Sequence, residues 1–213
     1  MGLTVRLAVA YPDFADELPA IVTALADHEQ PGYTETSRAL ADVVADSPNP
    51  AVRDGDWPSF PYTFLHYLRR IAVHLRIDPD WHPTEIDDPD DDDTYRDFSQ
   101  DHFDTETLEG SHLYCHSDSD GFYVPVDFET VIWGDGVPFV FLGSSQRLLA
   151  ELAAVGRALG FDWGERKPSP EELQRAFAES DDGMPFYREK YVFASMYEVA
   201  RLSVAFGTAI VFS

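Results

Sequence analysis

The residues best suited to chemistry gather in one short stretch, residues 111–128. It holds the only cysteine, two of the seven histidines and three spaced aspartates. Imidazole, thiol and carboxylate groups bind metals and serve as bases or nucleophiles. A catalytic or metal site would therefore be expected here, and three kinds of site are compatible with the spacing.

The first kind is a calcium site. Loop positions one, three, five, six and twelve hold His116, Asp118, Asp120, Gly121 and Asp127, which approximates the EF-hand pattern of oxygen ligands. A histidine replaces the first oxygen ligand, however, and the flanking residues favour strands over helices. Asp and Gly are ordinary turn residues, so a plain turn is favoured.

The second kind is a transition-metal site made by His112, Cys115 and His116. On a strand the two histidines would point the same way but lie about 13 Å apart, with the cysteine on the other face. The third kind is a Cys115 nucleophile with a histidine base. A lone cysteine is more often a small buried apolar residue, and no oxyanion-hole motif accompanies it. We keep as an alternative function a metal-binding protein or hydrolase, with calcium or zinc held by His112, His116, Asp118, Asp120 and Asp127.

The elements that would position these residues are predicted to form a β-hairpin. Residues 112–116 and 122–126 are rich in aromatic and β-branched side chains, and Asp120 and Gly121 supply the turn between them. Strands are also expected at 5–10 and 208–212. Helical spacing of apolar residues predicts helices that include 35–44, 61–76 and 185–206. The predicted fold is a single α+β domain over residues 1–213, whose small sheet is built on the central hairpin and the C-terminal strand and packed by five or six helices.

Two further patterns concern helices. Ser169, Pro170 and Glu172 form a capping box that should start a helix. The helix predicted at 61–76 carries a basic face, for which we favour carboxylates elsewhere in the chain as partners; its members are His66, Arg69, Arg70 and His74.

The formal net charge is -24, and there are only two lysines. Direct binding of nucleic acid or of an anionic membrane through a basic surface is therefore not expected. We expect a cytoplasmic protein, because no apolar run reaches membrane-spanning length and the first residues do not resemble a signal peptide. A single cysteine agrees with a reducing compartment.

The acidity is concentrated in residues 78–104, which are predicted to form a mobile loop rich in Pro and Asp. A run of like charges repels itself and commonly serves as an interaction segment. We expect the partner-binding residues within its densest part, namely Asp90, Asp91, Asp92 and Asp93.

The C-terminal half resembles a group of uncharacterised bacterial proteins with no established activity. The resemblance rests on His116-Ser-Asp-Ser-Asp-Gly-Phe-Tyr-Val-Pro-Val-Asp-Phe128, on the Gly143-Ser-Ser145 helix start, and on the closing strand after Gly207. The group pattern has Tyr where this chain has Phe122. Some small acidic proteins of similar style are immunity factors against bacterial toxins, which is an analogy of class that assigns no site residue.

The favoured function is a non-enzymatic acidic interaction protein without a cofactor. Its most concrete form is an immunity protein or inhibitor that covers a basic partner, such as a bacterial toxin, steered by long-range attraction. The metal-binding or hydrolase alternative comes second. Mimicry of a nucleic acid comes third, and competition with DNA for a common partner would distinguish it.

Overall fold

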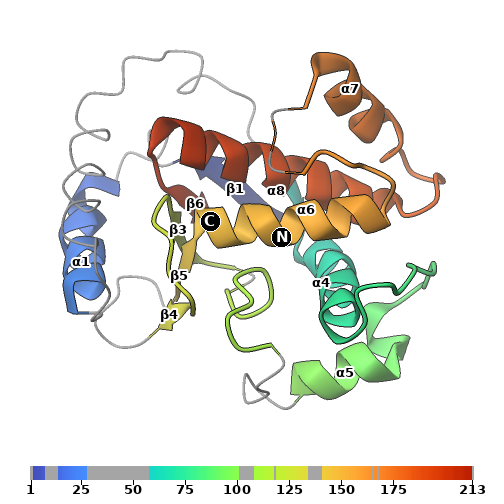
Figure 1. Cartoon of the computed structure of the whole chain (residues 1–213), viewed down its shortest axis with the longest axis horizontal. Coiled ribbons are helices and arrows are strands. Elements are labelled where there is room, and N and C mark those ends of the chain that lie inside the picture. Colours follow the sequence, from blue (N-terminus) through green and yellow to red (C-terminus); the bar gives the residue numbers. More distant parts are fainter. Residues whose placement is uncertain are drawn as a thin grey trace.

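The computed structural model shows a mixed β-sheet covered by helices (Figure 1). It describes residues 2–7, 14–27, 58–100, 108–117, 119–133, 141–164, 166 and 168–212. Within these residues the sheet has six strands, in the order β2-β1-β6-β3-β5-β4. The α+β class predicted from the sequence is confirmed. The strands are β1 (Gly2–Leu7), β2 (Ser59–Pro61), β3 (Gly121–Val124), β4 (Ile132–Trp133), β5 (Phe141–Ser144) and β6 (Ile210–Phe212).

The last strand lies in the middle of the sheet. β6 is antiparallel to both β1 and β3, while β3 and β5 run parallel. Phe122 of β3 is thus opposite Val211 of β6 on one side and Leu142 of β5 on the other. The C-terminal strand predicted from its β-branched residues is confirmed, and the sheet joins the two ends of the described chain.

The predicted β-hairpin is wrong. Residues 112–116 form turns, and β3 pairs with β6 and β5 along its two edges. Both edges of β3 are therefore occupied, which leaves no place for a strand at 112–116. The turn itself is correctly predicted, since Gly121 opens β3 with a φ of 116°, a conformation that side chains disfavour.

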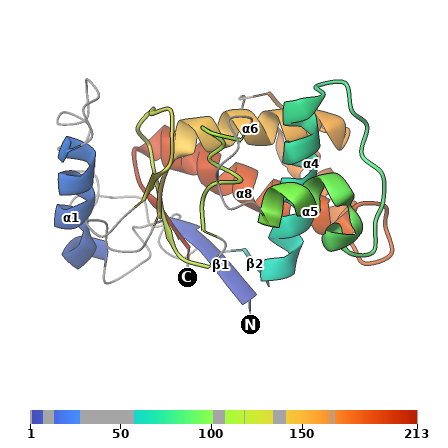
Figure 2. The same cartoon turned by 90° about the horizontal axis from the view of Figure 1, so that it is seen from below.

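Alternate residues of the strands face two different apolar clusters. Leu3, Val5 and Leu7 of β1 face the larger cluster, which is completed by α4 (Tyr62–Ile77), α6 (Ser145–Ala158) and α8 (Tyr187–Phe206). Phe122, Val124, Leu142 and Val211 face the other side, where Ile21 of α1 (Phe14–Asp27) packs. Figure 2 shows α1 on one side of the sheet and α4, α6 and α8 on the other. This alternation is the period of two expected of strands.

Local capping signals explain several helix ends. Ser169 and Glu172 form the predicted capping box at the start of α7 (Pro170–Ala178). Gly207 ends α8 with a φ of 65°. The helix predicted at residues 35–44 lies outside the described residues. Among the helices that the structure describes, none has the length and apolarity needed to cross a membrane.

The acidic segment predicted as a loop is partly helical. It contains the 3-10 helix η2 (Pro89–Asp91) and α5 (Asp93–Gln100), which packs near α4. Asp92 lies between the two elements and its side chain accepts a hydrogen bond from the Tyr95 N–H, which caps α5. The mobility predicted for this segment stays a prediction.

Candidate functional site

Both histidines of the central stretch lie in the core. His112 is fully buried; its Nδ1 accepts a hydrogen bond from the Ser144 N–H at 2.8 Å, and its Nε2 faces the Phe128 carbonyl oxygen at 3.0 Å. This network assigns the proton to Nε2, which donates to that oxygen. Burial lowers the pKa of His112 to about 4. The ring is therefore neutral near pH 7, and both of its nitrogens are occupied.

His116 is buried to the same degree and stacks on Tyr123, with 4.0 Å between the ring centroids. Its two nitrogens face the carbonyl oxygens of Ser117 and Phe122, each at 3.0 Å. Burial again lowers the pKa, to about 4. The sequence left open whether these histidines belong to the core or to a site, and the structure places both in the core.

Among the described residues, the proposed metal ligands do not gather into one group. Asp120 accepts a hydrogen bond from the Ser117 hydroxyl, and Asp127 forms an ion pair with Arg147 at 2.5 Å. Asp118 lies outside the described residues. Within the part of the chain that the structure describes, no group of three or more His, Cys, Asp or Glu side chains could hold a metal ion. The calcium or zinc alternative stays a prediction that direct binding measurements would test.

Cys115 is poorly placed to act as a nucleophile. Its thiol donates a hydrogen bond to the Leu108 carbonyl oxygen at 3.3 Å, and burial raises its pKa to about 11. The thiolate is the reactive form, so a thiol held protonated in this way is unreactive near pH 7.

Two charged side chains, the half-buried Glu151 and the buried Arg69, hold the turn that contains these residues. Glu151 of α6 accepts hydrogen bonds from the Ser111 hydroxyl and the His112 N–H, both at 2.6 Å. Arg69 of α4 donates to the Leu113 carbonyl oxygen at 2.9 Å and to the His116 carbonyl oxygen at 2.5 Å. The histidines, the cysteine and their polar neighbours thus fix the position of residues 111–116 between two helices.

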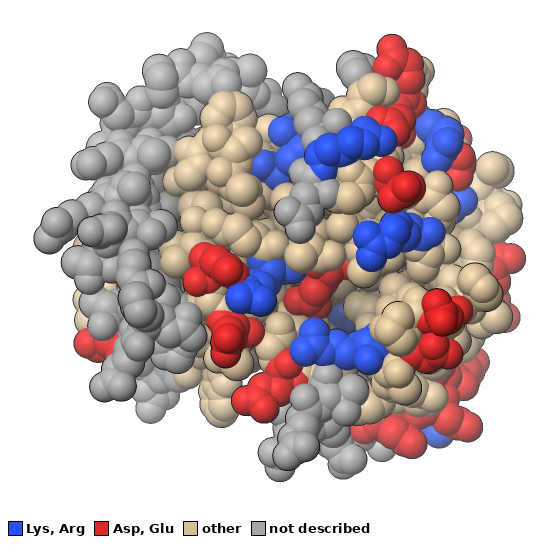
Figure 3. Space-filling view, viewed as in Figure 1, with Lys and Arg blue, Asp and Glu red and all other residues tan. Residues whose placement is uncertain are grey.

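The exposed carboxylates form a different feature, which we call the acidic strip. Residues 85–97 contain eight acidic residues and one arginine, Arg96. Carboxylates crowd the edge of the molecule next to α5 (Figure 3), whereas arginine and lysine side chains lie among carboxylates across the middle of that face. The strip consists of the exposed residues Glu85, Asp87, Asp88, Asp90, Asp91, Asp93 and Asp97.

Asp92 is the exception in this segment, because its side chain points into the protein and is only 11% exposed. It forms an ion pair with Arg70 at 2.8 Å, and its Oδ2 also lies 2.8 Å from Nε2 of His74. Burial alone would raise the pKa of Asp92, but hydrogen bonds from the Tyr95 N–H, Arg70 and His74 outweigh it and lower the pKa. Of the four aspartates predicted to bind a partner, Asp90, Asp91 and Asp93 are accessible and Asp92 is not.

Further contacts fix the strip on α4. Tyr95 is 1% exposed, and its hydroxyl lies 2.8 Å from Nδ1 of His66. Tyr67 donates a hydrogen bond to the Asp87 carbonyl oxygen, and Arg70 donates to the Thr84 carbonyl oxygen at 2.8 Å. The basic face of this helix therefore binds a carboxylate of the same chain through Arg70 and His74, as predicted for these two residues.

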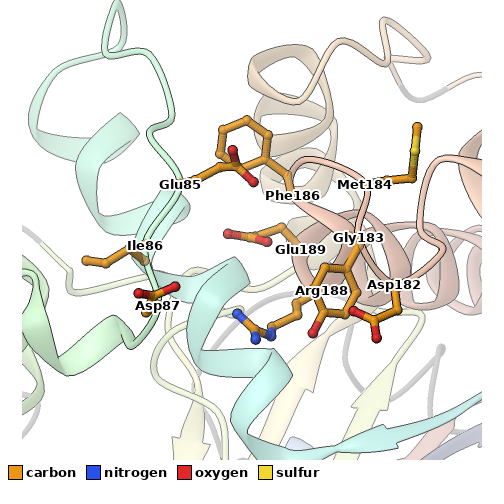
Figure 4. A pocket seen from close by; sticks show the side chains of 10 residues that line it. Glu85, Ile86, Asp87, Asp182, Gly183, Met184, Phe186, Arg188 and Glu189 are labelled. Carbon is orange, nitrogen blue, oxygen red and sulfur yellow. The ribbon is translucent and has the colours of Figure 1, made fainter.

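A pocket of about 350 Å³ opens between the strip and the start of α8 (Figure 4). Four carboxylates line it, together with Phe186, Tyr187 and Arg188. Glu189 is only 4% exposed, and its burial raises its pKa. The lining carboxylates are Glu85, Asp87, Asp182 and Glu189.

The structure combines an α+β fold with a strip of exposed carboxylates that lies beside α4. The family model described as "Putative DNA-mimic protein" matches residues 3–212, and the chain therefore belongs to this family. Comparisons with the curated proteins and with the solved structures gave no match.

Family membership corrects the partner expected from the sequence. We predicted a basic protein such as a bacterial toxin, whereas a DNA-mimic family indicates DNA-binding proteins as partners. The expected lack of direct nucleic-acid binding is compatible with the family. The net charge could not make this distinction, because it gives the sign of the partner surface but not what that surface normally binds.

Proposed function

We propose that this protein is a DNA mimic that occupies the DNA-binding surface of a DNA-binding protein. The observation that carries the proposal is the acidic strip, in which seven exposed carboxylates lie on a segment whose Asp92 and Tyr95 contact α4. Asp90, Asp91 and Asp93 are the proposed contacts at its centre, because all three are exposed.

The charge of the strip resembles that of a DNA backbone in kind. Double-stranded DNA carries one negative charge per roughly 1.7 Å of helix axis, and its binding proteins neutralise these charges with Lys and Arg side chains. A surface of closely spaced carboxylates can bind these Lys and Arg side chains in place of the DNA phosphates. Complementary charge also raises the association rate.

A fixed strip is better suited to this task than a mobile loop. Carboxylates that repel one another would spread apart in a flexible segment, and ordering them on binding would oppose association. We propose that the ion pair of Asp92 with Arg70 and the buried ring of Tyr95 hold the backbone in place before a partner binds. The cytoplasmic location expected from the sequence fits this function.

A displacement experiment tests the proposal. Host DNA-binding proteins are loaded on immobilised DNA, and the purified protein is added at low and at moderate salt. We expect specific DNA-binding proteins to be released into complexes with it, and we expect less release as salt screens the charges. Release of none of them at low salt would reject the proposal.

Matched variants separate the strip from general acidity. The triple variant Asp90→Asn, Asp91→Asn and Asp93→Asn should release little protein. The control Asp27→Asn, Glu129→Gln and Asp162→Asn removes the same number of charges from exposed positions away from the strip. It should behave as the wild type, and equal loss in both variants would show that only net charge matters.

A further inference from the structure

The pocket beside the strip is lined by a buried carboxylate, that of Glu189. Glu189 is more than nine-tenths buried, and its carboxylate accepts a hydrogen bond from its own backbone N–H in the first turn of α8. In Figure 4 the Glu189 side chain points into the pocket, on the side where Glu85 lies. These two like charges repel, and the repulsion adds to the effect of burial in raising the pKa of Glu189. A cation in the pocket would relieve both effects.

The cations already present act on Glu189 through electrostatic attraction. Arg188 lines the pocket and attracts Glu189, but its guanidinium carbon lies 4.7 Å from the ring centre of Tyr67 and 4.8 Å from that of Tyr187. Arg70 attracts Glu189 electrostatically while its hydrogen bonds go to Asp92 and Thr84. A buried carboxylate facing an open pocket is therefore left for an external donor.

The arrangement favours a guanidinium over a metal ion. The lining carboxylates do not converge closely enough to form a metal-binding group among the described residues. A guanidinium has five N–H donors in a rigid plane and can bridge carboxylates that a single ion cannot. Phe186 and Tyr187 add aromatic surface, on which a guanidinium also stacks.

The backbone at the pocket is unusual. Phe186 has a φ of 57°, which among the described residues makes it the one non-glycine residue with a positive φ. Side chains disfavour this conformation, and such positions often occur at binding sites. Here it places Phe186 in the pocket wall directly before α8.

We infer that this pocket receives an arginine side chain of the DNA-binding protein that the acidic strip contacts. The inference rests on the proposed function, and it adds to it a specific anchor. The strip would attract the cationic DNA-binding surface at long range, and Glu189 and Glu85 would pair with one inserted guanidinium. Removing one partner of a desolvated charged pair at an interface weakens binding strongly, whereas exposed pairs contribute little.

A model ligand tests the pocket without the partner. N-acetyl-arginine amide is titrated into the full-length protein, and backbone amide shifts are followed by NMR. We expect saturable shifts confined to residues 85–87 and 182–189. The citrulline analogue has the same shape without the charge and should give none, and the lysine analogue should bind more weakly. Equal binding of the lysine or citrulline analogue, or shifts spread over all acidic surfaces, would overturn the inference.

Variants complete the test. Glu189→Gln should weaken the arginine ligand about tenfold or more, since it removes a charge-assisted hydrogen bond. Glu85→Gln and Asp182→Asn alter exposed residues, so they test the pocket even if Glu189→Gln fails to fold. The strip variant Asp90→Asn, Asp91→Asn and Asp93→Asn should keep the ligand affinity within about threefold, because it leaves the pocket residues unchanged. Unchanged affinity in all pocket variants would refute the site.

The two proposals can fail separately. If the protein releases DNA-binding proteins from DNA but Glu189→Gln, Glu85→Gln and Asp182→Asn release them equally well, DNA mimicry stands and the arginine pocket is rejected. If the arginine ligand binds the pocket but no DNA-binding protein is released, the proposed function is rejected. The proposal that the arginine comes from a DNA-binding protein is then rejected as well.

Discussion

Replacing Asp92 with alanine should destabilise the fold far more than replacing its neighbour Asp91. Asp92 pairs with Arg70, whose side chain is 1% exposed, so its removal leaves a buried guanidinium without its charged partner. Breaking a buried pair in this way costs about 3–5 kcal/mol, and the partial exposure of Asp92 places the loss near 3 kcal/mol. Losing the helix cap to the Tyr95 N–H adds about 1 kcal/mol.

The expected total for Asp92→Ala is therefore about 4 kcal/mol, which for a chain of this size lowers Tm by about 8–16 °C. Asp91 is exposed, and Asp91→Ala should change the free energy of unfolding by no more than about 0.5 kcal/mol. Urea unfolding followed by circular dichroism measures both. A loss below about 1 kcal/mol for Asp92→Ala, or an equal loss for Asp91→Ala, would refute the assignment of Asp92 as the internal anchor.

Three further outcomes are expected. In the folded protein His112 and His116 have pKa values near 4, below their ordinary value. Their contribution to the free energy of unfolding is therefore fully present above about pH 6.5 and is lost as the pH falls towards about 4. The loss is up to about 1.4 kcal/mol per pH unit for each ring. His116→Gln should reduce the slope of unfolding free energy against pH by nearly one proton at about pH 5 and by about half a proton at about pH 6.5, and an unchanged slope would contradict a neutral buried ring. Glu151→Ala should cost about 3–5 kcal/mol in urea unfolding, because the Ser111 hydroxyl and the His112 N–H lose their acceptor; a loss below about 1 kcal/mol would show that water replaces it. Cys115 should react with a disulfide reagent at pH 8 about a hundredfold more slowly than an unhindered thiol, and a normal rate would disprove its burial.

Features fixed by neighbouring residues could be predicted from the sequence. The capping box at Ser169 and Glu172 depends on a spacing of three residues, and Gly207 ends a helix through its own backbone freedom. The C-terminal strand follows from its composition. Carboxylates of the same chain were also the predicted partners of Arg70 and His74, and Asp92 fills that role.

Pairing between distant residues could not be predicted in the same way. The turn at Gly121 is real, but the strands beside β3 are β5 and β6, so the local turn signal gave the wrong partner. Glu151 looks like a solvated residue of an amphipathic helix until its buried partners in the 111–116 turn are known. In sequence Asp92 cannot be told from the aspartates beside it; only the positions of Arg70 and His74 select it.

The partner class could not be predicted for a different reason. A net charge of -24 indicates attraction to cationic surfaces of any kind, whether on a toxin or on a DNA-binding protein. Family membership, and not a residue pattern, distinguishes the two.

The most direct test of DNA mimicry is an equilibrium competition with one released DNA-binding protein. Its binding to labelled DNA is followed by fluorescence anisotropy at increasing concentrations of this protein and at fixed salt. Mimicry predicts that the apparent Kd for DNA rises in proportion to the concentration of this protein, with no ternary complex, and that neutralising Asp90, Asp91 and Asp93 weakens the competition. A ternary complex with an unchanged Kd for DNA would contradict it.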